Sequence, residues 1–349
     1  MKAVRLHGPR DLRVDALNEP GQPGTGDVLL RVGAVGICGS DLHMVLDGRI
    51  GDTVFTSPLV IGHEFMGTIT AVGEGALDGS QRPLRVGQRV AVDPSTPCGH
   101  CEICERGYPN LCPNHTFYGV YPTPGALQEC MIVHGQNCFP IPDSIGDGAG
   151  TLLETLGVAI HAVDLGKLRV AETVAVIGCG PVGMLIVKLA LLAGSSVVYA
   201  FDKFPWRVEK AQKWGAQAYH ADSVDPLKTV MEATGGRGVD VAFEAGWADE
   251  SVQLAADMAR CGGRLVLVGI PGDDRLYLRH STARRKGLTI RMSRRMKHTY
   301  PRAIRLATSG AMDLDDLISE TVPLDQAPTA FDKNLRYEAG VQKIIIKVT

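Results

Sequence analysis

From residue 173 to residue 267, short apolar runs alternate with stretches of helical spacing. TVAVIG, SVVYAFD, VDVAFEAG and GRLVLVGI are apolar almost throughout. Such runs are typical of parallel strands buried on both faces, and parallel strands need crossover connections such as the helices between them. This part of the chain therefore predicts a doubly wound α/β domain with a parallel sheet.

A glycine pattern follows the first of these strands directly. Gly178, Gly180 and Gly183 match G-x-G-x-x-G, and Pro181 opens an apolar helix. The first glycine permits a tight turn, the second lets the backbone approach a pyrophosphate, and the third lets helix and strand pack closely. The positive end of the helix favours the phosphate charge. We therefore expect a dinucleotide to bind here.

An acidic residue ends the next strand. Asp202 lies where a carboxylate can bind both hydroxyls of the adenosine ribose. It would repel a 2′-phosphate, so the sequence favours NAD over NADP. Lys203 and Arg207 weaken that preference, because a nearby cation can accommodate the extra phosphate.

Four cysteines lie within fifteen residues in CGHCEICERGYPNLC: Cys98, Cys101, Cys104 and Cys112. Thiolates at this spacing are typical of one tetrahedral zinc ion, and a full thiolate shell makes the site structural. An iron–sulfur cluster is the alternative, but the last spacing is seven residues rather than three. Disulfides are less favoured, because nine cysteines is an odd number and the first residues have no apolar core of a secretion signal.

The charge balance argues against several classes of partner. The 349 residues include 36 basic and 38 acidic side chains, so nothing favours nucleic acid or an anionic membrane. No apolar run approaches the roughly 20 residues that span a bilayer. We expect a cytoplasmic globular protein of two domains. One basic cluster forms a solvated face or binds phosphates or a ribose at the edge of a site: Arg284, Arg285, Lys286, Arg291, Arg294, Arg295 and Lys297.

Residues 1–150 have short apolar strands broken by Gly and Pro, and they have no sustained helical period. We predict an irregular β domain with the cysteine lobe, about residues 94–115, as an inserted loop. The helical stretch LLETLGVAIHAVDLG leads into the dinucleotide domain, residues 151–295. Residues 296–349 end in the strand-like KIIIKV, and we assign them to the first domain.

The first domain also contains residues with the chemistry of a second metal site. Cys38 lies in GICGSDLH, and His63 and Glu64 follow an apolar run in GHE. With the cysteine lobe and the glycine motif, in this order, these residues resemble the zinc-dependent medium-chain alcohol dehydrogenase superfamily over essentially the whole chain. Within it the chain is most similar to sorbitol (L-iditol) and related polyol dehydrogenases, in the segments SDLH, GHE, LLETLGVAIHA and RRMKHTYPRAI.

The resemblance implies a GroES-like irregular β catalytic domain and a Rossmann coenzyme domain. It makes Cys38 and His63 ligands of a catalytic zinc, with Glu64 or Glu154 as the oxygen ligand. Ser40 and His43 match positions that relay a proton to solvent. A homo-oligomer, either a tetramer or a dimer, is also implied. Further coenzyme contacts carry over to Pro181, Val182, Arg207, Val268, Gly269, Ile270 and Arg295.

The implied reaction is oxidation of a secondary hydroxyl of a polyol or diol to a ketone. Zinc lowers the pKa of the hydroxyl, and NAD takes the hydride. Met44 and Met296 stand where similar sorbitol dehydrogenases carry tyrosines that bind substrate hydroxyls, which puts sorbitol itself in doubt. One alternative is a butanediol-type or threonine-type dehydrogenase. Another is a dinucleotide-binding regulator with structural zinc only, which would not need Cys38, His63 and a carboxylate.

Overall fold

The computed structural model describes residues 1–246, 248, 250–271 and 274–349. Among these residues, no helix combines the length and the apolar composition that crossing a bilayer demands.

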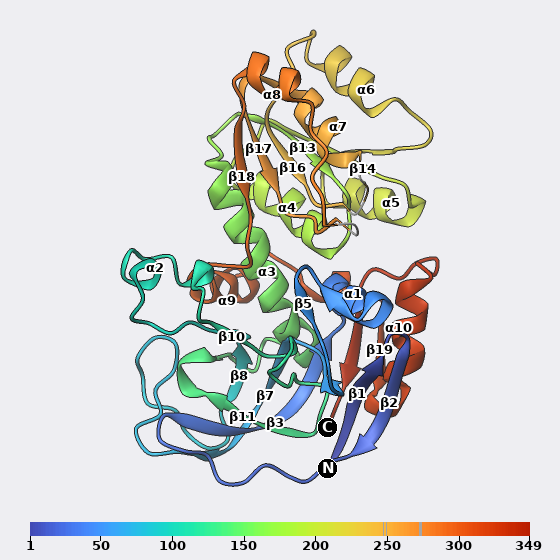
Figure 1. Ribbon diagram of the computed structural model, residues 1–349. Helices are drawn as coiled ribbons and strands as arrows, with labels where there is room; N and C mark the ends of the chain where they lie inside the picture. The colour runs from blue at the N-terminus through green and yellow to red at the C-terminus, as the bar shows by residue number, and fades with distance from the viewer. Residues whose placement is uncertain (247, 249, 272–273) are drawn as a thin grey trace. The chain divides into compact units, whose positions relative to one another are not determined.

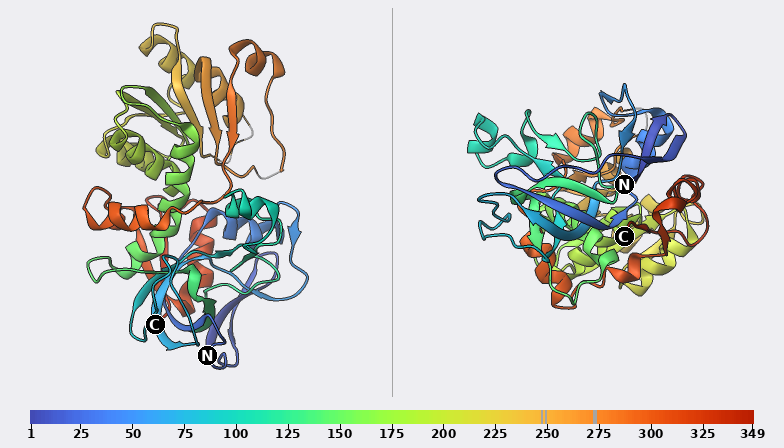
Figure 2. Two further views of the ribbon diagram at one scale, coloured as in Figure 1. Left: turned by 90° about the vertical axis from the view of Figure 1, so that its left-hand side faces the viewer. Right: turned by 90° about the horizontal axis from the view of Figure 1, so that it is seen from below.

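The chain forms two compact units (Figure 1). The first unit contains Met1–Thr155 and Tyr300–Thr349, and the second contains Leu156–Thr299. Helix α3 (Asp147–Gly166) begins in the first unit and ends in the second. Both chain termini lie close together in the first unit in all three views (Figures 1 and 2).

The first unit is built on a seven-stranded sheet of order β12-β8-β7-β3-β20-β19, with β11 also paired to β3. The run KIIIKV supplies β20, which pairs antiparallel with β3 and so lies inside the sheet. The strands of this sheet are β3 (Asp27–Gly36), β7 (Glu64–Val72), β8 (Arg89–Val92), β11 (Cys130–His134), β12 (Cys138–Pro140), β19 (Glu320–Pro323) and β20 (Ile344–Lys347).

Smaller elements complete the first unit. The structure has a helix, α1 (Gly39–Asp47), in a region whose sequence shows no helical period. A helix of nine residues is too short for its apolar residues to establish that period. The short strands are β1 (Lys2–Gly8), β2 (Asp11–Ala16), β4 (Arg49–Ile50), β5 (Thr53–Val54), β6 (Leu59–Val60), β9 (Ser95–Thr96) and β10 (Thr116–Phe117). The helices are α1 (Gly39–Asp47), α2 (Glu102–Glu105), α9 (Tyr300–Thr308) and α10 (Ala327–Leu335), with 3-10 turns η1 (Pro109–Leu111), η2 (Gly135–Asn137), η3 (Asp315–Leu317) and η4 (Leu324–Gln326).

The second unit contains a six-stranded parallel sheet of order β15-β14-β13-β16-β17-β18. This is the strand order of a doubly wound dinucleotide-binding fold, so the predicted fold class is confirmed. Its strands are β13 (Thr173–Ile177), β14 (Val197–Asp202), β15 (Gln217–His220), β16 (Val239–Glu244), β17 (Ala259–Leu267) and β18 (Thr289–Met292). Its helices besides α3 are α4 (Pro181–Leu192), α5 (Pro205–Lys213), α6 (Pro226–Ala233), α7 (Ser251–Met258) and α8 (His280–Lys286).

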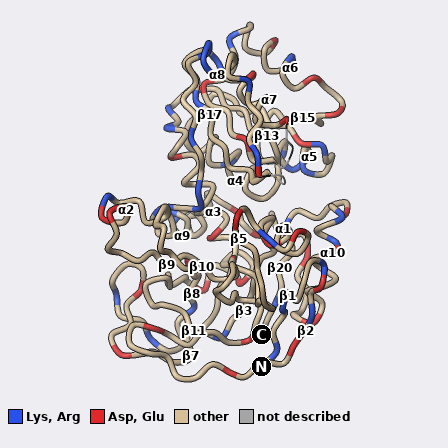
Figure 3. Tube along the Cα trace, in the orientation of Figure 1, with Lys and Arg blue, Asp and Glu red and all other residues tan. Residues whose placement is uncertain are grey.

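Burial explains which strands the sequence reveals. All six residues of the central strand β16 are buried, as expected for a strand covered on both faces. The edge strands β15 and β18 are partly exposed and carry polar residues, so their sequences do not stand out. The predicted basic cluster lies largely on α8 and the following segment (Figure 3). Most of it is exposed, but Lys286 donates to the carbonyls of Ala256, Asp257 and Ala259 at the end of α7.

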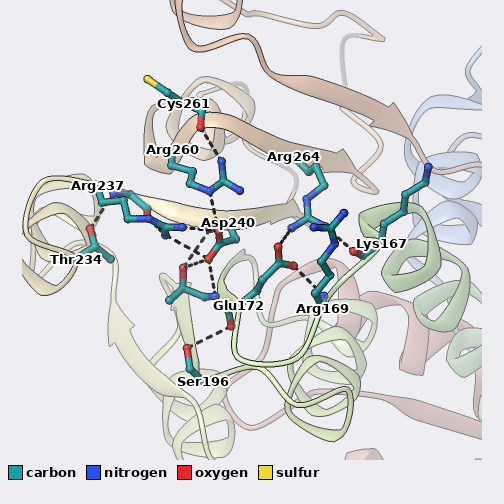
Figure 4. Close-up of polar contacts among 12 residues, drawn as sticks. Lys167, Arg169, Glu172, Ser196, Thr234, Arg237, Asp240, Arg260, Cys261 and Arg264 are labelled. Atoms are coloured by element: carbon teal, nitrogen blue, oxygen red, sulfur yellow. Dashed lines mark hydrogen bonds and ion pairs between the residues drawn. The ribbon is translucent and has the colours of Figure 1, made fainter.

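A polar cluster holds the amino ends of β13, β16 and β17 together (Figure 4). The buried carboxylate of Asp240 accepts hydrogen bonds from Arg237 at 2.6 Å, from Arg260 at 2.7 Å and from the backbone and hydroxyl of Thr173, both at 3.0 Å. Burial opposes ionisation, but these hydrogen bonds outweigh it and hold the pKa of Asp240 well below its usual value. Asp240 is therefore a charged anchor for three strands.

Asp240→Asn is expected to destabilise the protein by about 2 kcal/mol at neutral pH, because hydrogen bonds to a charged group are lost. The folded-state pKa lies below the unfolded value of about 3.9, so this contribution is complete well above pH 4 and is lost as the pH falls below it. Thermal unfolding at pH 7 and pH 3 measures both effects. Equal melting temperatures of the two proteins at pH 7 would contradict the prediction.

Candidate metal and coenzyme sites

Strand pairing in the first unit brings three predicted metal ligands together. Gly36 at the end of β3 pairs with Glu64 at the start of β7. This pairing brings Cys38, which follows β3, close to His63, which precedes β7. The ligand atoms of Cys38, His63 and Glu64 all lie within 4.8 Å of one another. Cys38 caps the N-terminus of α1, and the positive end of a helix stabilises a thiolate. One sulfur, one imidazole nitrogen and one carboxylate are a donor set that suits an open zinc site.

Asp41 orients two of these three ligands. One carboxylate oxygen lies 3.1 Å from His63 Nδ1, and the other accepts from the Cys38 backbone N–H at 3.0 Å. Since Nδ1 donates to Asp41, Nε2 keeps the lone pair that a metal would bind. Burial opposes a charged His63, but Asp41 and Cys38 outweigh it and raise its pKa. The sequence analysis did not single out Asp41, although it lies in the same CGSDLH segment.

The carboxylate of Glu64 is fully buried and only half satisfied by protein. Oε2 accepts from Lys343 Nζ at 2.5 Å, and Lys343 also donates to the Ile37 carbonyl at 2.9 Å. Oε1 has no hydrogen-bond partner among the residues that the structure describes. A buried carboxylate oxygen without a partner costs free energy, and a metal beside Cys38 and His63 would satisfy it. These residues therefore fit a zinc ion. Lys343, which the sequence analysis also missed, is the lysine that precedes the three isoleucines of β20.

Glu154, the other predicted oxygen ligand, lies near this cluster but is not one of its three members. It projects from α3 and is buried, and burial raises the pKa of its carboxyl group to about 8. Its charge interacts with those of His63 and Glu64. Of the two predicted oxygen ligands, Glu64 belongs to the described group with the Cys38 sulfur and the His63 ring.

One of the predicted relay residues, Ser40, lies beside the same histidine. Ser40 Oγ is 3.4 Å from His63 Nε2. His43 is buried, and its Nδ1 lies 3.9 Å from a carboxylate oxygen of Asp47, whose side chain is half exposed. The ring of Phe117 lies 5.4 Å from the His63 ring and adds an apolar wall. The cluster therefore has a hydroxyl beside the metal position and a histidine–carboxylate pair that leads to the surface.

The four-cysteine lobe forms a second, closed cluster. The sulfurs of Cys98, Cys101, Cys104 and Cys112 lie within 4.8 Å of one another, and all four thiols are free. Cys112 Sγ is 3.5 Å from Cys98 Sγ and 3.9 Å from Cys101 Sγ. A tetrahedron with metal–sulfur bonds of about 2.3 Å has edges of about 3.8 Å, so the lobe fits one zinc ion. A backbone hydrogen bond from His100 lowers the pKa of Cys98 to about 6, which favours the thiolate that a metal binds.

The glycine motif lies between the carboxyl end of β13 and the start of α4. Gly178 has a φ of +91°, and a Cβ there would lie 2.7 Å from the Ala245 carbonyl oxygen. A Cβ on Gly183 would overlap the Gly178 carbonyl oxygen. A Cβ on Gly180 would meet only Arg207 Nη1, at 3.9 Å. The loop is therefore tightly packed on the protein side and open beside the helix N-terminus, as a phosphate cradle requires.

Asp202 is held in place at the end of β14. It accepts hydrogen bonds from the backbone N–H groups of Cys179 at 2.7 Å and Phe204 at 2.9 Å, and Arg207 Nη1 lies 3.6 Å from its Oδ2. The Arg207 guanidinium also lies over the Phe204 ring, 4.9 Å from its centre. Each carboxylate oxygen has a second lone pair to accept a ribose hydroxyl. The Asp202 carboxylate therefore suits an adenosine ribose, and Arg207 lies near both Asp202 and Gly180.

The remaining predicted coenzyme residues belong to other segments of the second unit. Val268, Gly269 and Ile270 follow β17 at the carboxyl edge of the sheet, which is also the edge of Gly178 and Asp202. Arg295 follows β18 and has a φ of +54°, which is uncommon for a residue other than glycine. Pro181 and Val182 form the first turn of α4.

Comparisons with known proteins agree over the whole chain. Residues 24–143 match the family model of the alcohol dehydrogenase GroES-like domain, and residues 181–309 match that of the zinc-binding dehydrogenases. Sorbitol dehydrogenase of Bacillus subtilis (strain 168) is 35% identical over 99% of this chain and 97% of its own length.

Two solved structures are similar in sequence and fold. The 2R,3R-butanediol dehydrogenase of Bacillus subtilis superposes with a TM-score of 0.89, is 30% identical, and is matched over 100% of this chain and 99% of its own. An Escherichia coli CFT073 protein described as an alcohol dehydrogenase, solved with its cofactor NADH, has a TM-score of 0.88 and is 30% identical over 99% of both chains.

Proposed function

This chain belongs to the zinc-dependent alcohol dehydrogenase family, and from that membership and the geometry of its sites we propose that it oxidises a secondary hydroxyl of a polyol or diol with NAD. The observation that carries the proposal is the Cys38, His63 and Glu64 set, in which His63 and Glu64 are buried and Glu64 Oε1 has no partner among the described residues. A binding protein with structural zinc alone would not need such a set. The sorbitol and butanediol dehydrogenases among its relatives support the substrate class.

In this proposal zinc, held by Cys38, His63 and Glu64, supplies a Lewis acid that makes a substrate hydroxyl acidic near neutral pH. Asp41 fixes the His63 tautomer through Nδ1, and Lys343 donates a hydrogen bond to Glu64 that holds its carboxylate in place. Glu154 would add a buried carboxyl group whose charge interacts with those of His63 and Glu64.

Ser40 and His43 would carry the proton away from the reaction. The Ser40 hydroxyl lies beside the His63 ring, where it can accept a hydrogen bond from the substrate hydroxyl. An imidazole can both accept and donate a proton, and Asp47 next to His43 is half exposed to solvent. Phe117, whose ring lies 5.4 Å from the His63 ring, would shield one side of the metal position from water.

The coenzyme site would bind NAD through the glycine motif and Asp202. Gly178, Gly180, Pro181, Val182 and Gly183 would approach the pyrophosphate, and Asp202 with Arg207 would bind the adenosine ribose. The segment Val268, Gly269 and Ile270 and the residue Arg295 would complete the contacts. Asp202 disfavours the 2′-phosphate of NADP, and Arg207 reduces that penalty.

A small diol is the second candidate substrate, and one observation favours it. Met44, where similar sorbitol dehydrogenases carry a tyrosine, is almost fully buried in the core of the first unit. A thioether is at best a weak acceptor, so the chain lacks one polar group for a long polyol. We therefore expect vicinal diols such as butanediol, or amino alcohols such as threonine, to compete with polyols as substrates.

The test is NAD reduction at 340 nm over a panel of acyclic polyols, cyclic polyols, short diols and threonine, with zinc measured in the same preparation. We expect turnover that chelation abolishes and about two zinc ions per chain. One zinc per chain without turnover on any alcohol would contradict the proposal and favour a regulator. Two zinc ions without turnover would direct the search to other sugars.

We also propose that the protein is a cytoplasmic homo-oligomer, either a tetramer or a dimer. All nine cysteines are free thiols, which suits a reducing compartment. In the described sheet β18 is an edge strand, and its Met292 is exposed. Light scattering of the purified protein gives the number of chains directly, and a monomer would contradict this part of the proposal.

A further inference from the structure

We propose that Glu244 is a positioning residue for the coenzyme, a role that rests on the proposed binding of NAD. Glu244 is the last residue of the central strand β16, and its carboxylate lies at the carboxyl edge of the sheet. Dinucleotides bind at this edge in doubly wound folds. Glu244 is 3% exposed, so its carboxylate interacts with protein groups rather than with water.

The carboxylate joins two loops that flank the glycine motif. Oε1 accepts from the Gly246 backbone N–H at 2.8 Å and lies 2.7 Å from the Ser251 hydroxyl at the start of α7. The Gly269 backbone N–H donates to the Glu244 carbonyl at 3.1 Å and also lies near enough to the carboxylate to lower its pKa. The Glu244 carbonyl accepts from the Val268 N–H at 2.8 Å. One residue thus holds Gly246, just after β16, and Val268 and Gly269, just after β17.

Both loops form the surroundings of the predicted coenzyme. The backbone of Ala245 and Gly246 packs directly against Gly178, so a Cβ on Gly178 would lie 2.7 and 2.8 Å from their atoms. Gly269 is packed against the carboxylate itself, since a Cβ there would lie 2.7 Å from Glu244 Oε2. A shift of Glu244 would therefore move the phosphate turn and the Val268–Ile270 segment together.

The chemistry of the group favours a fixed acceptor. Burial raises the pKa of Glu244, and the hydrogen bonds from Ser251, Gly246 and Gly269 partly offset that rise. The Gly246 N–H can only donate, and Ser251 shares its one hydroxyl proton between Glu244 Oε1 and the Ala248 carbonyl, so an acceptor with free lone pairs suits this position. An amide of the same shape has one acceptor atom, so its NH₂ group would face at least one N–H or O–H donor.

Glu244→Gln tests the role with a minimal change in shape. We expect the Kd for NAD, measured by isothermal titration calorimetry, to rise about tenfold, because a hydrogen bond to a charged group is lost. The KM for NAD should rise with it, while kcat at saturating NAD stays within about twofold and zinc content is unchanged. A Kd equal to that of the wild type would overturn the inference.

The matched control lies on the same strand. Asp240 is a buried acid four residues earlier, at the opposite edge of the sheet. Asp240→Asn should lower the melting temperature without changing the Kd for NAD. If both variants raise the Kd equally, Glu244 acts only through the stability of the sheet and the inference fails.

Two further results keep the test decisive. Ser251→Ala removes one donor to the carboxylate, and we expect the Kd for NAD to rise about threefold. This variant decides the question if Glu244→Gln does not fold. An unchanged Kd for NAD in Ser251→Ala overturns the inference. Wild-type protein that does not bind NAD would refute the proposed function. Wild-type and Glu244→Gln proteins that bind NAD equally tightly would refute only the role of Glu244.

Discussion

Cys38→Ala is expected to lower kcat/KM for alcohol oxidation by about 10³-fold or more. The Lewis acid contributes several kcal/mol to the stability of the transition state, and each 1.4 kcal/mol is a factor of ten in rate. Without the sulfur, His63 and Glu64 retain only two ligands for a zinc ion that needs at least three from the protein. Zinc content should therefore fall from about two ions per chain to about one. Steady-state kinetics and elemental analysis of the same preparation measure both.

Cys130→Ala is the matched control for this prediction. Cys130 is a partly buried free thiol on β11 and belongs to neither cysteine cluster. Its substitution should leave zinc content and kcat/KM within about twofold of the wild type. The NAD affinity of Cys38→Ala should also be unchanged, because the glycine motif and Asp202 belong to the other unit. A Cys38→Ala variant that keeps two zinc ions and full turnover would refute the metal site.

The sequence predicted the parts of the structure that local patterns encode. The buried runs of β13, β14, β16 and β17 are apolar because both faces of the sheet are covered, and the glycine motif needs only the turn between β13 and α4. The four cysteines lie in one short loop, so their spacing alone indicates a shared metal.

Long-range pairing explains what the sequence did not reveal. Lys343 is 279 positions from Glu64, and the two meet because β20 inserts beside β3 in the sheet. Asp41 is close to Cys38 in sequence, but its contact with His63 depends on the pairing of β3 with β7. Likewise, Glu244 gave no signal in a run of buried residues, because its partners lie on two loops that the sheet topology brings together. In each case an ordinary charged residue acquires its role from strand order.

Lys343→Met is the second change with a large expected effect. Lys343 and Glu64 are each about 2% exposed or less, so removing the ammonium leaves a buried carboxylate without its cation. Breaking a buried ion pair in this way costs about 3–5 kcal/mol. Burial opposes the charge of Lys343, but Glu64 and Cys38 outweigh it and raise its pKa, so the group is charged at neutral pH. Urea unfolding of the chelator-treated protein should show this loss of stability against wild type treated identically.

The double variant Glu64→Gln/Lys343→Met separates a lost ion pair from lost packing. It leaves no buried charge at either position, so it should recover most of the stability that Lys343→Met loses. Lys347→Met, on the exposed side of the same strand, is the matched control and should stay within about 0.5 kcal/mol of the wild type. With zinc bound, Lys343→Met should lose less, because the metal charge would compensate Glu64. If the double variant is as unstable as Lys343→Met, the methylene chain of the lysine, rather than its charge, stabilises this part of the fold.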